Sequence, residues 1–259
     1  MDTTYVRARL FTSSALFLLF SFILGIVFFL VQALFGYDPT YREYMPLVSL
    51  LYLGSVFLLT YYSVKQYSKE SQFIFFIACL SFFIRLVWIL TIDTQPMSDF
   101  QMMYDSAIKM ANGDFSYNND GYFLSWTYQL GFTMYQALII KIFGSHLIIL
   151  KFLNVLFCTG TTVLIYKIAL QLFNDFSAKF SSITFCFFIP NIIMSSVLSN
   201  QHLATFLFYL GFYLIIEKLE PSKKTSIIAG AIISVANLMR PLGSMIILCI
   251  IIYYFFYSY

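Results

Sequence analysis

The sequence predicts an all-α polytopic membrane protein with about eight transmembrane helices, and three observations indicate this class. Of the 259 residues, 60% are hydrophobic and only 10% are charged, against about 25% charged in an average soluble domain. Apolar segments long enough to cross a membrane recur along the chain. Lysine and arginine gather in particular connections between these segments, as they do in the cytoplasmic loops of membrane proteins.

The apolar segments define the predicted helices. A bilayer core needs a helix of about 20 apolar residues. The candidate spans are residues 10–35, 46–62, 72–91, 147–170, 178–198, 203–216, 226–239 and 242–257. We divide the chain into two amino-terminal transmembrane helices within residues 1–71 and a transmembrane core of residues 72–259, which contains the connection 93–125.

Charged residues beside the first spans predict the orientation. Arg7 and Arg9 precede the first span, and Lys65 and Lys69 follow the second. These positions place the amino terminus in the cytoplasm of a multi-pass cell-membrane protein, because cationic connections stay inside. Residues 93–125 then form an extracytoplasmic loop. The loop is acidic, with Asp93, Asp99, Asp105, Asp114 and Asp120 against a single cation, Lys109.

A further apolar stretch, residues 122–143, decides the rest of the topology. Later lysines gather in two connections, around Lys167 and Lys179 and around Lys223 and Lys224. Both connections are cytoplasmic only if residues 122–143 do not cross the bilayer. We therefore interpret this stretch as an interfacial or re-entrant helix.

The polar residues of that stretch fit the interfacial interpretation. They follow helical spacing and form one stripe: Ser125, Gln129, Thr133 and Gln136. A helix with a polar stripe beside bulky apolar residues can lie in the plane of the membrane interface. The alternative is a crossing helix whose polar stripe packs against its neighbours.

The outer loop contains a predicted amphipathic helix on the membrane surface. Ser98 and Gln101 have the spacing of a capping box, which satisfies free amides at a helix start. Apolar residues then keep helical spacing, and Asn112 with Gly113 is a typical stop signal. We expect a juxtamembrane helix over about residues 99–112.

Polar residues near the outer ends of the spans predict a cavity that opens outward. Asn191 and His202 lie on one helical face with two serines between them, and Arg240 lies between two apolar runs. Arg85 lies inside the third span, where an arginine normally has a partner or a water-filled cavity. We expect Arg85 to pair with a carboxylate of the loop.

Several short stretches also resemble a known family. They are residues 96–100 (Pro-Met-Ser-Asp-Phe), 128–132 (Tyr-Gln-Leu-Gly-Phe), 142–144 (Ile-Phe-Gly), 170–173 and 236–241, with Tyr104, Ala107, Gly113 and Pro190. In this order and spacing they resemble the bacterial membrane glycosyltransferases of the GT-C superfamily, in particular the protein O-mannosyltransferase and aminoarabinose-transferase type of Gram-positive bacteria. The resemblance covers residues 72 to the end.

The resemblance implies a function. Such enzymes move a sugar from a polyprenyl-phosphate donor to an acceptor at the outer membrane face, which is a cell-envelope glycan, a lipid or a protein. Asp99 matches the catalytic base, and Arg240 matches a residue that binds the lipid phosphate. We place Gln129, Tyr128 and His202 in the same donor site, together with Arg85.

The chain also departs from the family pattern. Some members have an acidic residue in the second outer loop, where this chain has Asn200, Gln201 and His202. We therefore assign no metal ligands, and a divalent-cation requirement stays open. Members are usually longer, so the resemblance implies an amino-terminal portion or a truncated copy.

The expected partners are the lipid-linked sugar and the bilayer. Nucleic acid is not expected, because no basic run with interleaved aromatics occurs.

Two other functions compete with this hypothesis. A polar cavity between helices would also suit a multi-pass transporter, and a non-catalytic role in polysaccharide assembly is a further alternative. The geometry distinguishes them: a transferase needs Asp99 beside a groove open to lipid with Arg240 across it, whereas a transporter needs access from both sides.

Overall fold

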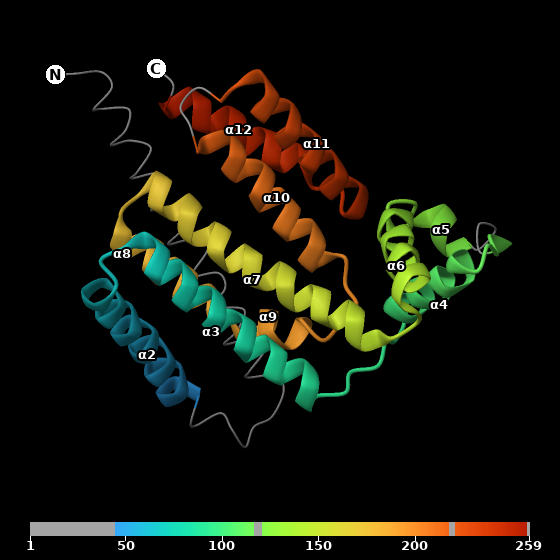
Figure 1. Ribbon diagram of the computed structural model, residues 1–259, viewed down its shortest axis with the longest axis horizontal. Helices are drawn as coiled ribbons and strands as arrows, with labels where there is room; N and C mark the ends of the chain where they lie inside the picture. The colour runs from blue at the N-terminus through green and yellow to red at the C-terminus, as the bar shows by residue number, and fades with distance from the viewer. Residues whose placement is uncertain (1–44, 117–120, 218–220, 258–259) are drawn as a thin grey trace. The chain divides into compact units, whose positions relative to one another are not determined.

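The structure, a computed structural model, describes residues 45–116, 121–217 and 221–257, and all regular structure in these ranges is helical (Figure 1). The helices are α2 (Met45–Gln66), α3 (Glu70–Thr91), α4 (Asp99–Ala111), α5 (Gly121–Ser125), α6 (Gln129–Phe143), α7 (Leu147–Leu172), α8 (Asp175–Cys186), α9 (Ile189–Met194), α10 (Gln201–Ile216), α11 (Lys223–Met239) and α12 (Gly243–Tyr257). The predicted all-α class is confirmed for these residues.

The chain forms two compact units. The larger unit comprises residues 59–248 and contains α3 to α11. The smaller unit comprises residues 1–58 and 249–259, and its described parts belong to α2 and α12. The helices α3, α7 and α10 all belong to the larger unit.

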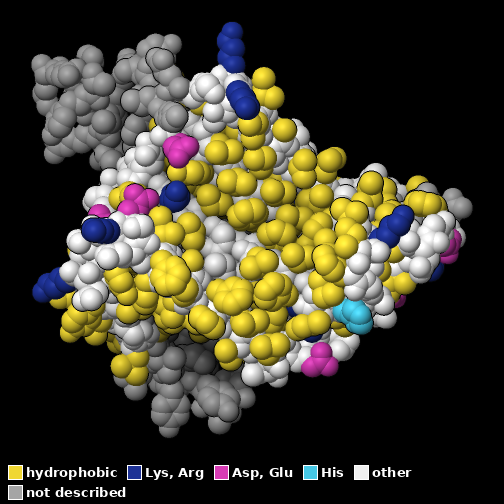
Figure 2. All heavy atoms as spheres, viewed as in Figure 1, with side chains coloured by type: hydrophobic (Ala, Val, Ile, Leu, Met, Phe, Trp, Pro, Cys, Tyr) yellow, Lys and Arg dark blue, Asp and Glu magenta, His cyan; other side chains and the backbone are white. Residues whose placement is uncertain are grey.

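Among the residues that the structure describes, α3 and α7 are long and apolar enough to cross a membrane, and α10 is a shorter apolar helix. Large apolar side chains on α3 point outward, including Phe75 at 74% and Leu90 at 66% exposure. Figure 2 shows hydrophobic side chains over much of the face formed by α7 and its neighbours. The predicted span 10–35 lies outside the described residues, and the count of eight spans stays a prediction.

The predicted single helix over residues 178–198 is wrong. α8 ends at Cys186, and a separate short helix, α9, begins at Ile189 with Pro190 in its first turn. Proline has no backbone N–H to donate to the carbonyl four residues earlier, and its ring clashes with that carbonyl, so a continuous helix cannot run through Pro190. The break therefore leaves carbonyl groups at the end of α8 that need other donors.

The helices of the larger unit pack side by side through small and polar residues. α3 contacts α7 where the Ser81 and Thr162 hydroxyls lie 2.9 Å apart. α7 contacts α10 at Gly160, where an added Cβ atom would meet the ring of Phe206. α10 contacts α11 at Gly211 in the same way. Small residues at these positions let the helix axes approach closely, as is common between membrane helices.

The connections α2–α3, α7–α8 and α10–α11 lie at one end of the unit, here called the lysine end. Lys179 donates a 2.8 Å hydrogen bond to the carbonyl oxygen of Tyr67, and pairs with Asp175 at 2.8 Å. Lys167 lies over the ring of Tyr213, near the end of α10. The cationic connections predicted to share one side of the membrane therefore do share one end of the unit.

The opposite end, here called the loop end, contains the start of α7 and both termini of α6. Lys151 near the start of α7 forms an ion pair with Asp93 at 3.6 Å. The Tyr104 hydroxyl on α4 donates to the carbonyl oxygen of Ser145, just after α6. Because α6 also begins at this end, it packs beside α4 and does not run to the lysine end (Figure 1). This arrangement fits the interfacial interpretation of residues 122–143.

The polar stripe of that stretch faces inward. Thr133 and Gln136 are fully buried, while Met134, Leu138 and Ile142 on the opposite face of α6 are more than half exposed. The stripe therefore packs against the protein, as the alternative interpretation expected, although the helix stays at the loop end. Ser125 does not extend the stripe, because it ends the separate helix α5.

The predicted surface helix over residues 99–112 is α4, and its buried residues include Met103 and Tyr104. The predicted capping box is wrong. Ser98 has a positive φ of 53° and makes no side-chain bond to the helix amides. Its hydroxyl instead lies 3.5 Å from a carboxylate oxygen of Asp99.

Candidate functional site

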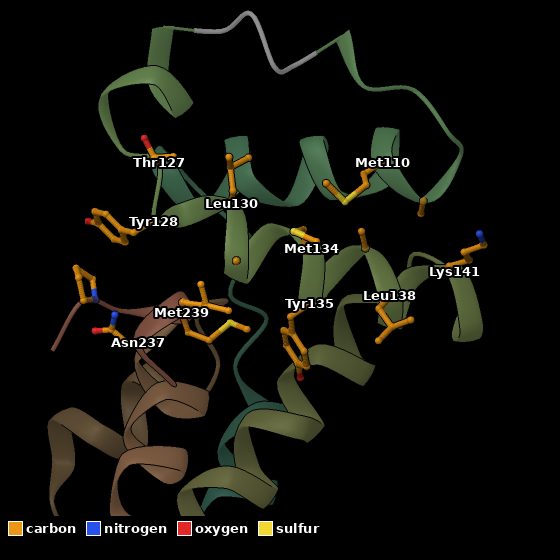
Figure 3. Close-up of a pocket in the computed structure, with 15 residues that line it drawn as sticks. Met110, Thr127, Tyr128, Leu130, Met134, Tyr135, Leu138, Lys141, Asn237 and Met239 are labelled. Carbon is orange, nitrogen blue, oxygen red and sulfur yellow. The ribbon is translucent and has the colours of Figure 1, made fainter. Parts of the chain in front are cut away.

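A groove of about 950 Å³ lies at the loop end, between α6, the end of α4 and the end of α11 (Figure 3). Its walls are mainly apolar and include Leu130, Met134 and Leu138 of α6, Met110 of α4, and Met239. The polar groups among its lining residues are Thr127, Tyr128, Tyr135, Lys141 and Asn237. Such a groove suits an apolar chain with a polar group at one end.

Gly131 allows α6 and α11 to meet at the base of this groove. A Cβ atom at Gly131 would collide with the backbone carbonyl of Leu238. The two backbones therefore touch at this point, and only glycine fits without a shift. Gly131 belongs to the stretch 128–132 that resembled the glycosyltransferases, and its structural role is this close approach.

A polar cluster lies beside the groove and joins α6, the start of α10 and the end of α11. The Asn200 amide donates to Gln129 Oε1 at 3.0 Å and to the carbonyl oxygen of Met239 at 2.8 Å. Its oxygen Oδ1 lies 3.5 Å from an N–H group of Arg240. Gln129 and Arg240, both predicted site residues, are thus brought together by a residue between them.

Arg240 is a half-buried cation with spare donors. The 3.5 Å contact with Asn200 is the one hydrogen bond of its side chain to described residues, and the side chain forms no ion pair with a described carboxylate. A guanidinium has five N–H donors. Its flanking residues Met239 and Pro241 both line the groove. Arg240 can therefore bind an anionic group beside the groove without breaking a strong internal contact.

Asp99 is exposed at the start of α4, and its charge acts on Tyr122. Burial first, and then the negative charge of Asp99, raise the pKa of the Tyr122 hydroxyl. Tyr128, which lines the groove, acts on Tyr122 in the same direction. The Tyr122 hydroxyl is buried, and the Gln129 side chain acts on it as a hydrogen-bond partner that opposes part of the rise in its pKa. Tyr122 thus lies within electrostatic reach of Asp99 and of Tyr128, which lines the groove.

Arg85 has a different environment from the one we expected. It is fully buried and pairs with no described carboxylate. Its N–H groups donate to Asn191 Oδ1 at 2.9 and 3.2 Å, and to the carbonyl oxygens of Phe185 and Cys186 at the end of α8. It also donates to Ser81 Oγ at 2.7 Å. The predicted pairing with a loop carboxylate is therefore wrong, because the break after α8 supplies neutral oxygens instead.

Both ring nitrogens of His202 also have hydrogen-bond partners within the protein. It is 4% exposed, and its Nε2 atom lies 2.8 Å from the carbonyl oxygen of Met194. A carbonyl oxygen only accepts, so Nε2 donates, and in the neutral ring Nδ1 accepts from the Cys158 thiol at 3.2 Å. These contacts give no support to donor binding by His202 or by Arg85.

The site includes two residues that the sequence analysis did not assign. Asn200 appeared there only as a departure from the family pattern, and Tyr122 only as the first residue of an apolar stretch. The signal for Asn200 was its place in a short polar connection. The described residues contain no group of three His, Cys, Asp or Glu side chains that could hold a metal ion.

In the part of the chain that the structure describes, all regular structure is helical, two helices are long and apolar enough to cross a membrane, and an apolar groove lies beside a half-buried arginine. Comparisons with known protein families, with curated proteins and with solved structures find no match to this chain.

Proposed function

We propose that this chain is a membrane glycosyltransferase, or the groove-bearing part of one, which moves a sugar from a polyprenyl-phosphate donor to an acceptor at the outer face of the membrane. The observation behind the proposal is an apolar groove of about 950 Å³ lined by both sequence neighbours of Arg240, a cation whose side chain has spare donors. A polyprenyl chain needs an apolar groove, and a phosphate needs a cation where lipid excludes water.

The reaction assigns a role to each group. The acceptor oxygen attacks the anomeric carbon and loses its proton, which the Asp99 carboxylate takes. The bond between the anomeric carbon and the phosphate oxygen breaks, and the polyprenyl phosphate leaves with that electron pair. The leaving phosphate gains negative charge, and Arg240 stabilises it. Tyr122, beside Asp99, can donate a hydrogen bond to a sugar or acceptor oxygen.

Transfer of label tests the proposal. Membranes containing the protein are incubated with radiolabelled polyprenyl-phosphate sugars, and release of label from the lipid fraction is measured. We expect release with one donor of the panel, and loss of release in Asp99→Asn. If no sugar leaves any donor of a broad panel, the transferase proposal is wrong.

The transporter alternative predicts a different result. A transporter would move an intact labelled solute across sealed vesicles without breaking the sugar–phosphate bond. The groove lies at the loop end, and Arg85, deeper in the unit, has no exposed surface. These two facts favour a site that opens at one end, as a transferase requires.

A further inference from the structure

We propose that Asn200 sets the ligand selectivity of the groove: its neutral amide orients Arg240 without cancelling the arginine charge, so the site selects lipids that bear a phosphate over neutral lipids of the same length. This inference rests on the proposed function and concerns the donor end of the same site.

The contacts of Asn200 fix its orientation. The side chain is 5% exposed, so its polar atoms must bond within the protein. The Met239 carbonyl, 2.8 Å away, can only accept, so the amide nitrogen faces it. The amide oxygen then faces Arg240 at 3.5 Å. Asn200 therefore cannot turn its oxygen away from Arg240 without placing oxygen against oxygen at Met239.

The same contacts hold the two walls of the groove together. Asn200 bonds to Gln129 at the start of α6 and to Met239 at the end of α11. These are the two helices whose backbones touch at Gly131 and Leu238. The position of Arg240 is thus linked to the position of the groove wall, so the charge lies at a defined distance from the apolar lining.

The charge of the residue at position 200 decides how Arg240 acts. An amide dipole orients a guanidinium but leaves its full charge for a ligand. A carboxylate at the same place would form an ion pair with Arg240, and a ligand phosphate would then have to displace it. Arg85 differs from Arg240 in another respect, because its donors are used by several neutral oxygens inside the protein.

Two variants with the same branched skeleton of side-chain heavy atoms separate the effect of charge from the effect of lost hydrogen bonds. Asn200→Asp and Asn200→Leu both remove the bond donor to Met239 and Gln129, but only the aspartate adds a negative charge. Binding of undecaprenyl phosphate and of undecaprenol is measured for the full chain in detergent or nanodiscs. We expect Asn200→Asp to bind the phosphate at least about tenfold more weakly than Asn200→Leu. The two variants should bind the neutral alcohol equally.

Each outcome has a definite meaning. If the unsubstituted protein binds the phosphate no better than the alcohol, the proposed function and this inference both fail. If it prefers the phosphate but Asn200→Asp and Asn200→Leu bind it equally, the proposed function stands and this inference is wrong. A preference for the phosphate that falls in Asn200→Leu and falls much further in Asn200→Asp supports the inference.

Discussion

The Lys179 ammonium group donates a 2.8 Å hydrogen bond to the carbonyl oxygen of Tyr67, which is 112 residues earlier in the chain. This contact joins the α2–α3 connection to the start of α8. It places Lys65 and Lys69 at the same end as Lys179. Cationic connections normally remain in the cytoplasm, so the lysine end should be cytoplasmic and the loop end should lie outside.

Cysteine labelling tests this orientation. We expect Ser116→Cys, an exposed site in the outer loop, to react with an impermeant thiol reagent on intact cells, and Lys223→Cys to react only after permeabilisation. The background should be Cys249→Ser, because Cys249 is the exposed native cysteine among the described residues. Labelling of Lys223→Cys from outside would show that α6 crosses the membrane.

The contact of α6 with α11 predicts a specific glycine effect. Gly131→Ala should lower the midpoint of thermal unfolding in detergent by about 5 °C or more, because the new methyl group meets the Leu238 carbonyl. Gly230→Ala is the matched control, since its Cβ atom would meet nothing within 4 Å. That change should leave the midpoint equal or higher, because alanine favours helix by about 0.5–1 kcal/mol. Equal midpoints for the two variants would contradict the close approach.

The sequence predicted the individual helices better than the contacts between residues that are distant in the chain. The helical class and the existence of α3, α4 and α7 follow from apolar length and periodicity. The break at Pro190 was missed because the residues on both sides are apolar and the overall length suits one span. A proline inside such a run was the available signal.

The sequence predicted only part of the site, because its contacts join residues that are far apart in the chain. Arg240 and Gln129 lie 111 residues apart in sequence and meet only through Asn200. Nothing local in the chain encodes such a contact. The partners of Arg85 were predicted wrongly for the same reason. The carbonyls of Phe185 and Cys186 accept its hydrogen bonds where α8 ends, and Asn191, 106 residues away in sequence, supplies a side-chain oxygen.

Arg85 should matter for stability. Replacing Arg85 with methionine removes the donor to the Cys186 carbonyl and one of the two donors to the Phe185 carbonyl. We therefore expect a loss of about 2–4 kcal/mol in the free energy of unfolding. Arg240→Met is the control, because Arg240 makes one long bond and should change stability by less than about 1 kcal/mol. Denaturant titration in mixed micelles measures both. Similar losses for the two arginines would contradict the assigned environments.

Arg240 should matter for binding instead. We expect Arg240→Ala to weaken binding of the phosphate-bearing donor by about 10-fold or more, because the phosphate loses its cation. Acceptor affinity should change little. Arg240→Lys should recover part of the binding, since lysine supplies a point charge but no planar fork. An unchanged donor affinity in Arg240→Ala would show that this arginine only anchors the end of α11.

The catalytic assignment depends on Asp99, which the structure places at the exposed start of α4 with its charge acting on Tyr122. A carboxylate in a first helical turn also has an ordinary role, because it interacts favourably with the free amides there. Asp99→Asn keeps the shape of the side chain and removes the base. We expect turnover to fall by about 100-fold or more, with expression and donor binding near normal.

Two aspartates of the same loop are controls for the loss of negative charge. Asp105 is exposed on α4, and the Asp114 carboxylate accepts a hydrogen bond from the Ser116 amide, which lowers the pKa of Asp114. Asp105→Asn and Asp114→Asn should reduce turnover by far less than Asp99→Asn, because neither carboxylate acts on Tyr122. Single-turnover measurements with bound donor compare the three variants at the chemical step. If Asp99→Asn behaves like the two controls, its role is confined to the helix start, and the base must be another residue.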